Sequence, residues 1–94
     1  MATYIMLGKF STTAVKEISA ERTKKANDII EGCRGKAKAI YALLGETDVV
    51  AIAEFPGVNE AMRASIELSK LLGISFSTSP AVTVDEFDKL IEGR

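Results

Sequence analysis

The sequence contains no histidine and no tryptophan, only two prolines and a single cysteine, Cys33. Histidine is the commonest general base near neutral pH and the commonest metal ligand. Its absence excludes Ser-His-Asp and Cys-His catalysis, and it excludes zinc or haem sites that depend on histidine. A single cysteine excludes an intramolecular disulfide and is typical of a reducing compartment. We therefore expect no metal and no cofactor, and any catalysis would use carboxylates, tyrosine, lysine, arginine or the thiol.

The sequence also lacks an excess of charge of either sign, because it has 12 basic and 13 acidic residues and a net charge of −1. This balance gives no electrostatic attraction to nucleic acid. No apolar run is long enough to span a bilayer, and no signal peptide precedes the first strand pattern. We accordingly expect a cytoplasmic protein that binds neither nucleic acid nor membrane.

The 94 residues favour a single domain over 1–94. A domain this short buries only about two-thirds of its unfolded surface. Its hydrophobic fraction is nonetheless 47%, and a small chain with apolar surface to spare often buries it against another subunit. The two halves also differ in charge, with a net +3 over residues 1–47 and −4 over 48–94. A solvated mixed surface explains this asymmetry, and complementary subunit faces are the alternative.

Hydrophobic periodicity predicts four strands and three helices. An apolar stripe from Val15 to Cys33 predicts a first helix that breaks near Ile18–Ala20, where Ser19 caps its second part. Asn59 is expected to cap the second helix and Gly73 to end it, while Thr83 and Glu86 form the capping box of a short final helix. The predicted strands are Ala2–Leu7, Lys36–Leu44, Val49–Phe55 and Ile74–Pro80.

This order is β-α-β-β-α-β plus a C-terminal helix, which predicts an α+β fold of the ferredoxin-like type with an antiparallel four-stranded sheet. Right-handed crossovers place both long helices on one face of the sheet. If water covered the other face, alternate strand positions would be polar, yet Tyr4 to Leu7, Ile40 to Leu44 and Val49 to Ala53 are apolar throughout. We expect that face to pack on the sheet of another subunit.

Several segments resemble the GYD-domain family, small proteins of largely unassigned function grouped with dimeric α+β-barrel folds. The similarity spans nearly the whole chain. The segments that carry it are 2–9 (ATYIMLGK), 19–22 (SAER), 43–50 (LLGETDVV), 54–56 (EFP) and 78–83 (TSPAVT). The resemblance implies a ferredoxin-like homo-oligomer, a dimer first and a trimer or higher assembly as the alternative. It implies no established reaction.

One position departs from the family pattern. The motif that names the family places an aromatic residue just before the aspartate, and this chain has Thr47 there. Only Gly45 and Asp48 carry over from the motif. If the tyrosine hydroxyl has a shared role in the family, this chain lacks it at that position.

Asp48, with Glu46 beside it in the hairpin between the second and third strands, is the first candidate site. Two nearby carboxylates could hold a proton or a cation, and an apolar pocket would raise the pKa of one of them. The structural alternative, which we favour, is that Gly45 supplies a positive φ and Asp48 bonds amides of the loop.

Tyr4, Tyr41 and Glu54 complete the candidate set. The two tyrosines could line a cavity, and packing in the core or at an interface is the alternative that we favour. Glu54 could form a structural ion pair with Lys9 or Arg22. Cys33 lies on the apolar stripe near a helix C-terminus, where a free cysteine is usually a small buried hydrophobe.

Two functions of different classes follow from these observations. The first is a homo-oligomeric module that binds a small, largely apolar ligand or serves in sensing or assembly. The second is a cofactor-free isomerase or oxygenase of the kind that dimeric α+β-barrels contain, with Asp48, Tyr41 or Tyr4 in a pocket between sheet and helices. A perturbed carboxylate facing a closed cavity would favour the enzyme.

Overall fold

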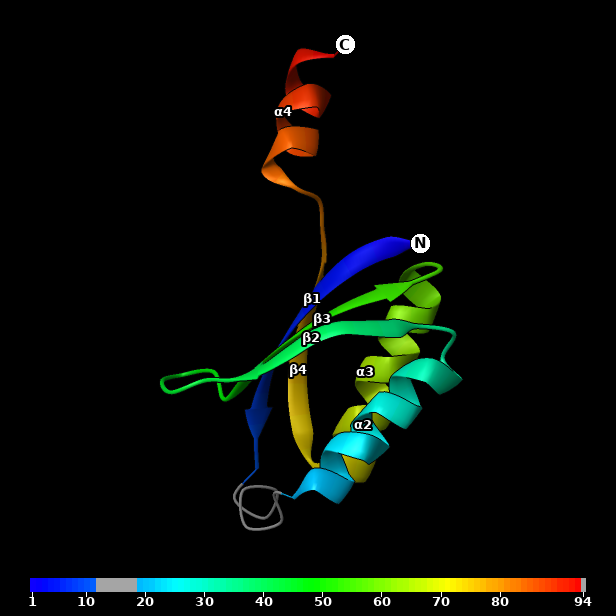
Figure 1. Cartoon of the computed structure of the whole chain (residues 1–94), viewed down its shortest axis with the longest axis vertical. Coiled ribbons are helices and arrows are strands. Elements are labelled where there is room, and N and C mark those ends of the chain that lie inside the picture. The colour runs from blue at the N-terminus through cyan, green and yellow to red at the C-terminus, as the bar shows by residue number, and fades with distance from the viewer. Residues whose placement is uncertain (12–18, 94) are drawn as a thin grey trace.

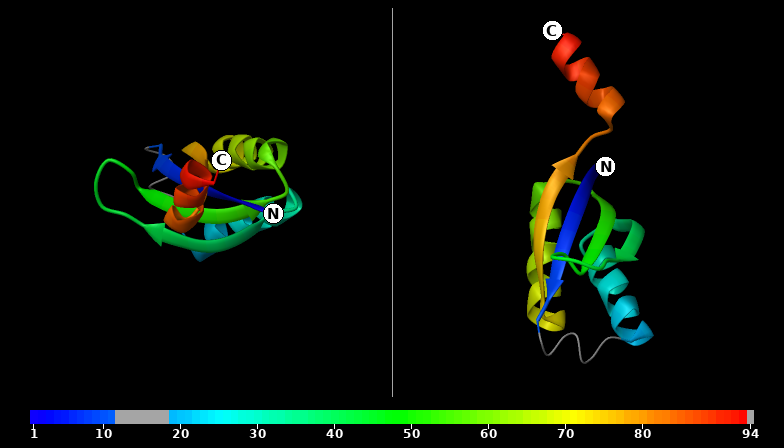
Figure 2. Two further views of the ribbon diagram at one scale, coloured as in Figure 1. Left: turned by 90° about the horizontal axis from the view of Figure 1, so that it is seen from above. Right: turned by 90° about the vertical axis from the view of Figure 1, so that its left-hand side faces the viewer.

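A computed structural model of the chain describes residues 1–11 and 19–93. The described part has the order βαββαβα, which confirms the ferredoxin-like fold with an added C-terminal helix (Figure 1). Both long helices cover the same face of the sheet, as Figure 2 shows. The elements are β1 (Ala2–Phe10), α2 (Ala20–Gly32), β2 (Lys36–Ala42), β3 (Val49–Phe55), α3 (Val58–Leu72), β4 (Ile74–Ala81) and α4 (Val84–Glu92).

The sheet is antiparallel and its strand order is β2-β3-β1-β4, so β2 and β4 are the edges. One row of paired residues crosses it at the end where β4 leaves, running from Lys36 to Glu54, Thr3 and Ala81. A bulge between Ala37 and Ala39 makes Lys38 the extra residue of β2. The polar alternation of β4 predicts an edge strand, and the observed order confirms this.

The core lies between the sheet and the two long helices. Met6, Ala53, Phe55 and Ala64 are fully buried there. The rings of Tyr4 and Phe55 meet edge to face, with their centroids 5.8 Å apart. Small side chains on α3 let this helix approach the sheet closely, so the apolar faces of strands and helix form one cluster.

Local capping determines where the helices begin and end. The Ser19 hydroxyl accepts a hydrogen bond from the Arg22 amide at 3.2 Å, and the Thr83 hydroxyl accepts one from the Glu86 amide at 3.1 Å. Gly73 ends α3 in the left-handed conformation with φ of 69°. These three predicted ends are confirmed. The predicted helical residues Val15 and Ile18 lie outside the described residues.

Two local predictions are wrong. The α3 N-cap is Gly57, which has an extended φ of −171°, so the predicted cap Asn59 lies inside the first turn. Strand β2 ends at Ala42 and not at Leu44, because the chain turns away into the hairpin loop, where Leu44 is fully exposed.

The described residues leave the second face of the sheet uncovered. Tyr4 and Met6 of β1 are buried under the helices, whereas Ile5 and Leu7, which alternate with them, are 36% and 43% exposed. Tyr41 of β2 lies on the same open face and is 59% exposed. Ile5, Leu7, Tyr41, Val50 and Ile52 are called the open-face cluster below. On β4 the open face carries Ser75, Ser77 and Ser79 instead.

Helix α4 stands beyond the end of the sheet and away from the other two helices (Figures 1 and 2). None of its nine residues is buried. Its apolar side chains, Val84, Phe87, Leu90 and Ile91, are between 52% and 74% exposed. None of the helices in the described part of the chain combines the length and apolar character needed to cross a membrane.

Candidate functional site

Asp48 joins the β2–β3 hairpin to the end of β1. Its Oδ2 accepts a hydrogen bond from the Phe10 amide at 2.9 Å. Its own amide donates to the Gly8 carbonyl at 2.9 Å, and its carbonyl accepts from the Leu43 amide at 2.8 Å. The carboxylate thus bonds an amide of β1, 38 residues away, and Gly45 does have a positive φ of 140°. The Asp48 side chain therefore has a structural role, because it holds the hairpin against the end of β1 at Phe10.

Glu46 is exposed in the same hairpin, and its backbone carbonyl accepts a hydrogen bond from Lys9 Nζ at 3.0 Å. Like the Asp48 contacts, this bond ties the loop to β1. Among the described residues, no group of three or more carboxylates, thiols or imidazoles is arranged to hold a metal ion. Of this acidic pair, only Asp48 fastens the hairpin through its side chain, because Lys9 bonds the backbone of Glu46.

The two tyrosines lie on opposite faces of the sheet. Tyr4 is 4% exposed beneath the helices, whereas Tyr41 belongs to the open-face cluster. The sheet separates the two side chains, so they cannot line one cavity. The five predicted site residues therefore do not converge.

Glu54 lies on the open face at the end of the sheet where β4 leaves, between Lys36 and Thr3. Lys9 is six residues farther along β1 than Thr3, which is about 20 Å at the rise of a strand. Lys9 is consequently out of reach of Glu54. Arg22 donates to the Leu72 carbonyl on the helix side of the sheet.

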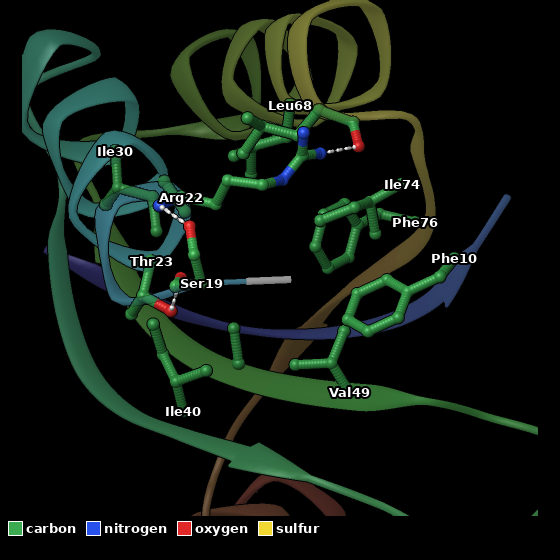
Figure 3. A pocket seen from close by; sticks show the side chains of 13 residues that line it. Phe10, Ser19, Arg22, Thr23, Ile30, Ile40, Val49, Leu68, Ile74 and Phe76 are labelled. Atoms are coloured by element: carbon green, nitrogen blue, oxygen red, sulfur yellow. Dashed lines mark hydrogen bonds between the residues drawn. The ribbon is translucent and has the colours of Figure 1, made fainter. Parts of the chain in front are cut away.

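A hollow of about 100 Å³ lies between the sheet and the helices, at the end where α2 begins (Figure 3). All four strands and both long helices contribute to it, and nearly all of its surface is apolar. The side chains lining it are those of Phe10, Ser19, Arg22, Thr23, Ala26, Ile30, Ile40, Val49, Ala51, Leu68, Leu72, Ile74 and Phe76.

Three polar residues from the first turn of α2 form one side of this hollow. The Arg22 side chain extends across it to the Leu72 carbonyl, as Figure 3 shows. The Ser19 hydroxyl accepts from the Arg22 amide, and the Thr23 hydroxyl donates to the Ser19 carbonyl at 3.4 Å. An apolar chamber with a few polar groups at one side is typical of small-molecule sites.

Asp48 is linked to this hollow although it does not line it. Its carboxylate accepts a hydrogen bond from the amide of Phe10, which lines the hollow. Val49, which also lines it, follows Asp48 directly in the chain. Asp48 is therefore a positioning residue for one wall. The sequence does not predict the lining, because its residues are ordinary core types. The one local signal is the presence of small alanines, Ala26 and Ala51, among larger apolar neighbours.

Cys33 lies at the other end of α2, away from this hollow. It is 4% exposed. Burial raises the pKa of its thiol, and the nearby charge of Glu67 raises it further. At neutral pH the side chain is a thiol and not a thiolate, which agrees with the interpretation of a small buried hydrophobe.

Comparison with solved structures supports the fold. Crystallographic coordinates of the leucine response regulatory protein (LrpA) from Mycobacterium tuberculosis superpose with a TM-score of 0.58 at 7% sequence identity. The superposition covers 87% of this chain and 51% of that chain, so this chain spans about half the length of LrpA. At this identity the likeness concerns the fold alone. No curated protein matches in sequence.

Comparison with protein families gives a match over nearly the whole sequence. The GYD domain matches residues 4–91, from β1 through most of α4. This confirms the resemblance that the strand and hairpin segments indicate. The chain belongs to the GYD-domain family.

Proposed function

We propose that this protein is a homo-oligomeric module that binds a small, largely apolar ligand in the hollow between the sheet and the helices. The observation that carries this proposal is the lining, which is apolar on every side contributed by the sheet and α3 and polar only where α2 begins. Such a lining favours a molecule with an apolar body and one polar end. The proposed orienting groups are Arg22, Ser19 and Thr23.

The size of the hollow limits the ligand. A cavity of about 150 Å³ lined by apolar side chains holds one benzene molecule, and sites for drug-sized ligands measure roughly 300–1,000 Å³. A hollow of about 100 Å³ therefore suits a short alkyl chain or, with slight movement of the walls, a single small ring.

The lining supplies binding groups and not reacting ones. Among the described residues that line the hollow there is no carboxylate, no tyrosine and no thiol. The enzyme hypothesis needs a carboxylate or tyrosine at the ligand, so binding is the function that we propose.

Assembly is the second half of the proposal, and the open-face cluster supports it. These side chains form a continuous apolar surface at the centre of the sheet, and exposed apolar patches of this kind mark interaction sites. A second copy that presents the same face would remove both patches from water.

Native mass spectrometry of gently purified protein tests both halves together. We expect a multimer that carries added mass from a retained ligand, and that takes up toluene when the ligand is stripped. Ala26→Leu, which places a larger side chain in the hollow, should abolish uptake of toluene. Ala20→Leu, the same change at an exposed position of α2, should leave it intact. Equal uptake by both variants would refute the proposed site.

A further inference from the structure

Helix α4 is amphipathic, but no described part of its own chain buries its apolar side. Its apolar side chains recur at spacings of three and four, which is one stripe of a helix. All of them are more than half exposed, because α4 stands off the end of the sheet (Figure 1). An isolated helix of nine residues is marginal in water, and helices this short are stabilised mainly by packing of the apolar stripe.

The charges of α4 indicate what covers it. Val84–Glu92 carries four carboxylates, Asp85, Glu86, Asp88 and Glu92, against the single ammonium of Lys89. The segment 34–38 has the opposite sign, with three basic residues and no acidic one, although Glu54 of β3 pairs with Lys36. The exposed Lys36 and Lys38 at the beginning of edge strand β2 belong to it, next to the exposed Arg34. An acidic helix and a basic sheet edge on the same chain are complementary between two copies.

The topology brings these two surfaces together. Ala81, where the chain leaves for α4, and Lys36 belong to the same row across the sheet but lie on opposite edges. If two open faces meet about a two-fold axis parallel to the strands, the strand order of one copy is reversed over the other, and β4 lies over β2. The end of β4 in one copy then lies over the beginning of β2 in the second.

We propose that α4 is an arm exchanged between copies. The apolar stripe of α4 packs against the second copy where its β2 begins, and the carboxylates of α4 face Lys36 and Lys38 of that copy. This inference rests on the proposed assembly through the open face, and it names the element that completes the interface. Each dimer contains two such contacts, one at each edge.

A mixing experiment tests the exchange directly. One variant carries Lys36→Glu with Lys38→Glu, and the other carries Asp88→Lys with Glu92→Lys; all four positions are exposed. Each variant alone should dimerise about tenfold more weakly at low salt, because like charges then face each other in both contacts. In a mixed dimer both contacts pair opposite charges again. Native mass spectrometry should therefore show heterodimer well above its binomial share, and this excess should vanish in about 1 M salt.

The controls separate this inference from the assembly itself. Lys24→Glu with Lys25→Glu makes the same change of charge on α2, on the other side of the sheet, and should neither weaken the dimer nor enrich heterodimer with the α4 variant. Phe87→Ser with Ile91→Ser should weaken the dimer about tenfold or more. A wild-type monomer would overturn the assembly and the arm together. A stable wild-type dimer with binomial mixing would overturn the arm alone.

Discussion

Asp48 has a side chain that could take part in catalysis, but in this fold its carboxylate has a structural role. Its carboxylate accepts a hydrogen bond from the Phe10 amide, and its backbone forms hydrogen bonds with Gly8 and Leu43. One residue thus fastens the hairpin to β1. The ligand site that we propose depends on this bond indirectly, because Phe10 and Val49 line the hollow. A carboxylate at this position thus supports the site without contacting the ligand.

Asp48→Ala removes the acceptor of the Phe10 amide. Leaving a part-buried amide unpaired should lower the free energy of unfolding by about 1–2 kcal/mol, as measured by urea denaturation. Asp48→Asn retains an acceptor oxygen and should lose less. Glu46→Ala, in which the backbone carbonyl bonded by Lys9 remains, should have no measurable effect. Equal losses for the alanine variants of Asp48 and Glu46 would contradict the role given to the Asp48 carboxylate.

Cys33 should make the free energy of unfolding decline as the pH rises into the alkaline range. Because burial raises its pKa in the folded chain, the folded state holds the thiol proton at pH values where the unfolded chain has released it. The stabilisation is complete below the ordinary thiol pKa of about 8.5 and is lost as the pH rises through the higher folded value. Urea denaturation between about pH 7 and 10.5 should show this decline. Cys33→Ala should be less stable throughout, with a shallower decline over that range.

The turn between α2 and β2 is decided by close packing. Arg34 has a positive φ of 65°, and Gly35 then passes directly beside Phe55. A Cβ at Gly35 would overlap the Phe55 ring, whereas a Cβ at Gly32, the last residue of α2, would meet no atom within 4 Å. Glycine is therefore required at Gly35 and not at Gly32, because the backbone at Gly35 passes close to the buried Phe55 ring.

Gly35→Ala and Gly32→Ala form a matched pair at the level of the element. Gly35→Ala should lower the free energy of unfolding by about 1–3 kcal/mol, because the Phe55 ring or the backbone must move. Gly32→Ala should be neutral or stabilising by a few tenths of a kcal/mol, since alanine is the better helix former. Thermal denaturation followed by circular dichroism compares them, and a similar loss for both would refute the argument from packing.

The whole molecule is a two-layer fold that lacks a third layer. The helices bury one face of the sheet, and the open-face cluster and the stripe of α4 remain exposed in the single chain. Exposed apolar patches of this kind mark interaction sites, and the proposed second copy would cover both of them.

Leu7→Asp tests whether the open-face cluster forms the interface of the proposed assembly. Leu7 is 43% exposed in the chain, so the substitution should change the stability of the monomer little while it places a charge in the centre of the proposed interface. Light scattering should then give the mass of a single chain at micromolar concentration. Ile66→Asp, at an apolar exposed position on the outer side of α3, should leave the multimer intact. A wild-type mass equal to one chain would remove the proposed assembly.

The sequence by itself determined the order of elements, most of their ends and the exposed edge strand, because these depend on local periodicity, caps and turn residues. Ser19, Gly73 and Thr83 mark helix ends through bonds and φ angles within a few residues. The candidate site was different. Asp48, Tyr4, Tyr41 and Glu54 are chemically suggestive, yet strand register and the two faces of the sheet separate them. The hollow exists only because side chains from six elements meet around a space that Ala26 and Ala51 leave unfilled, and such a meeting of distant residues is decided by tertiary packing alone.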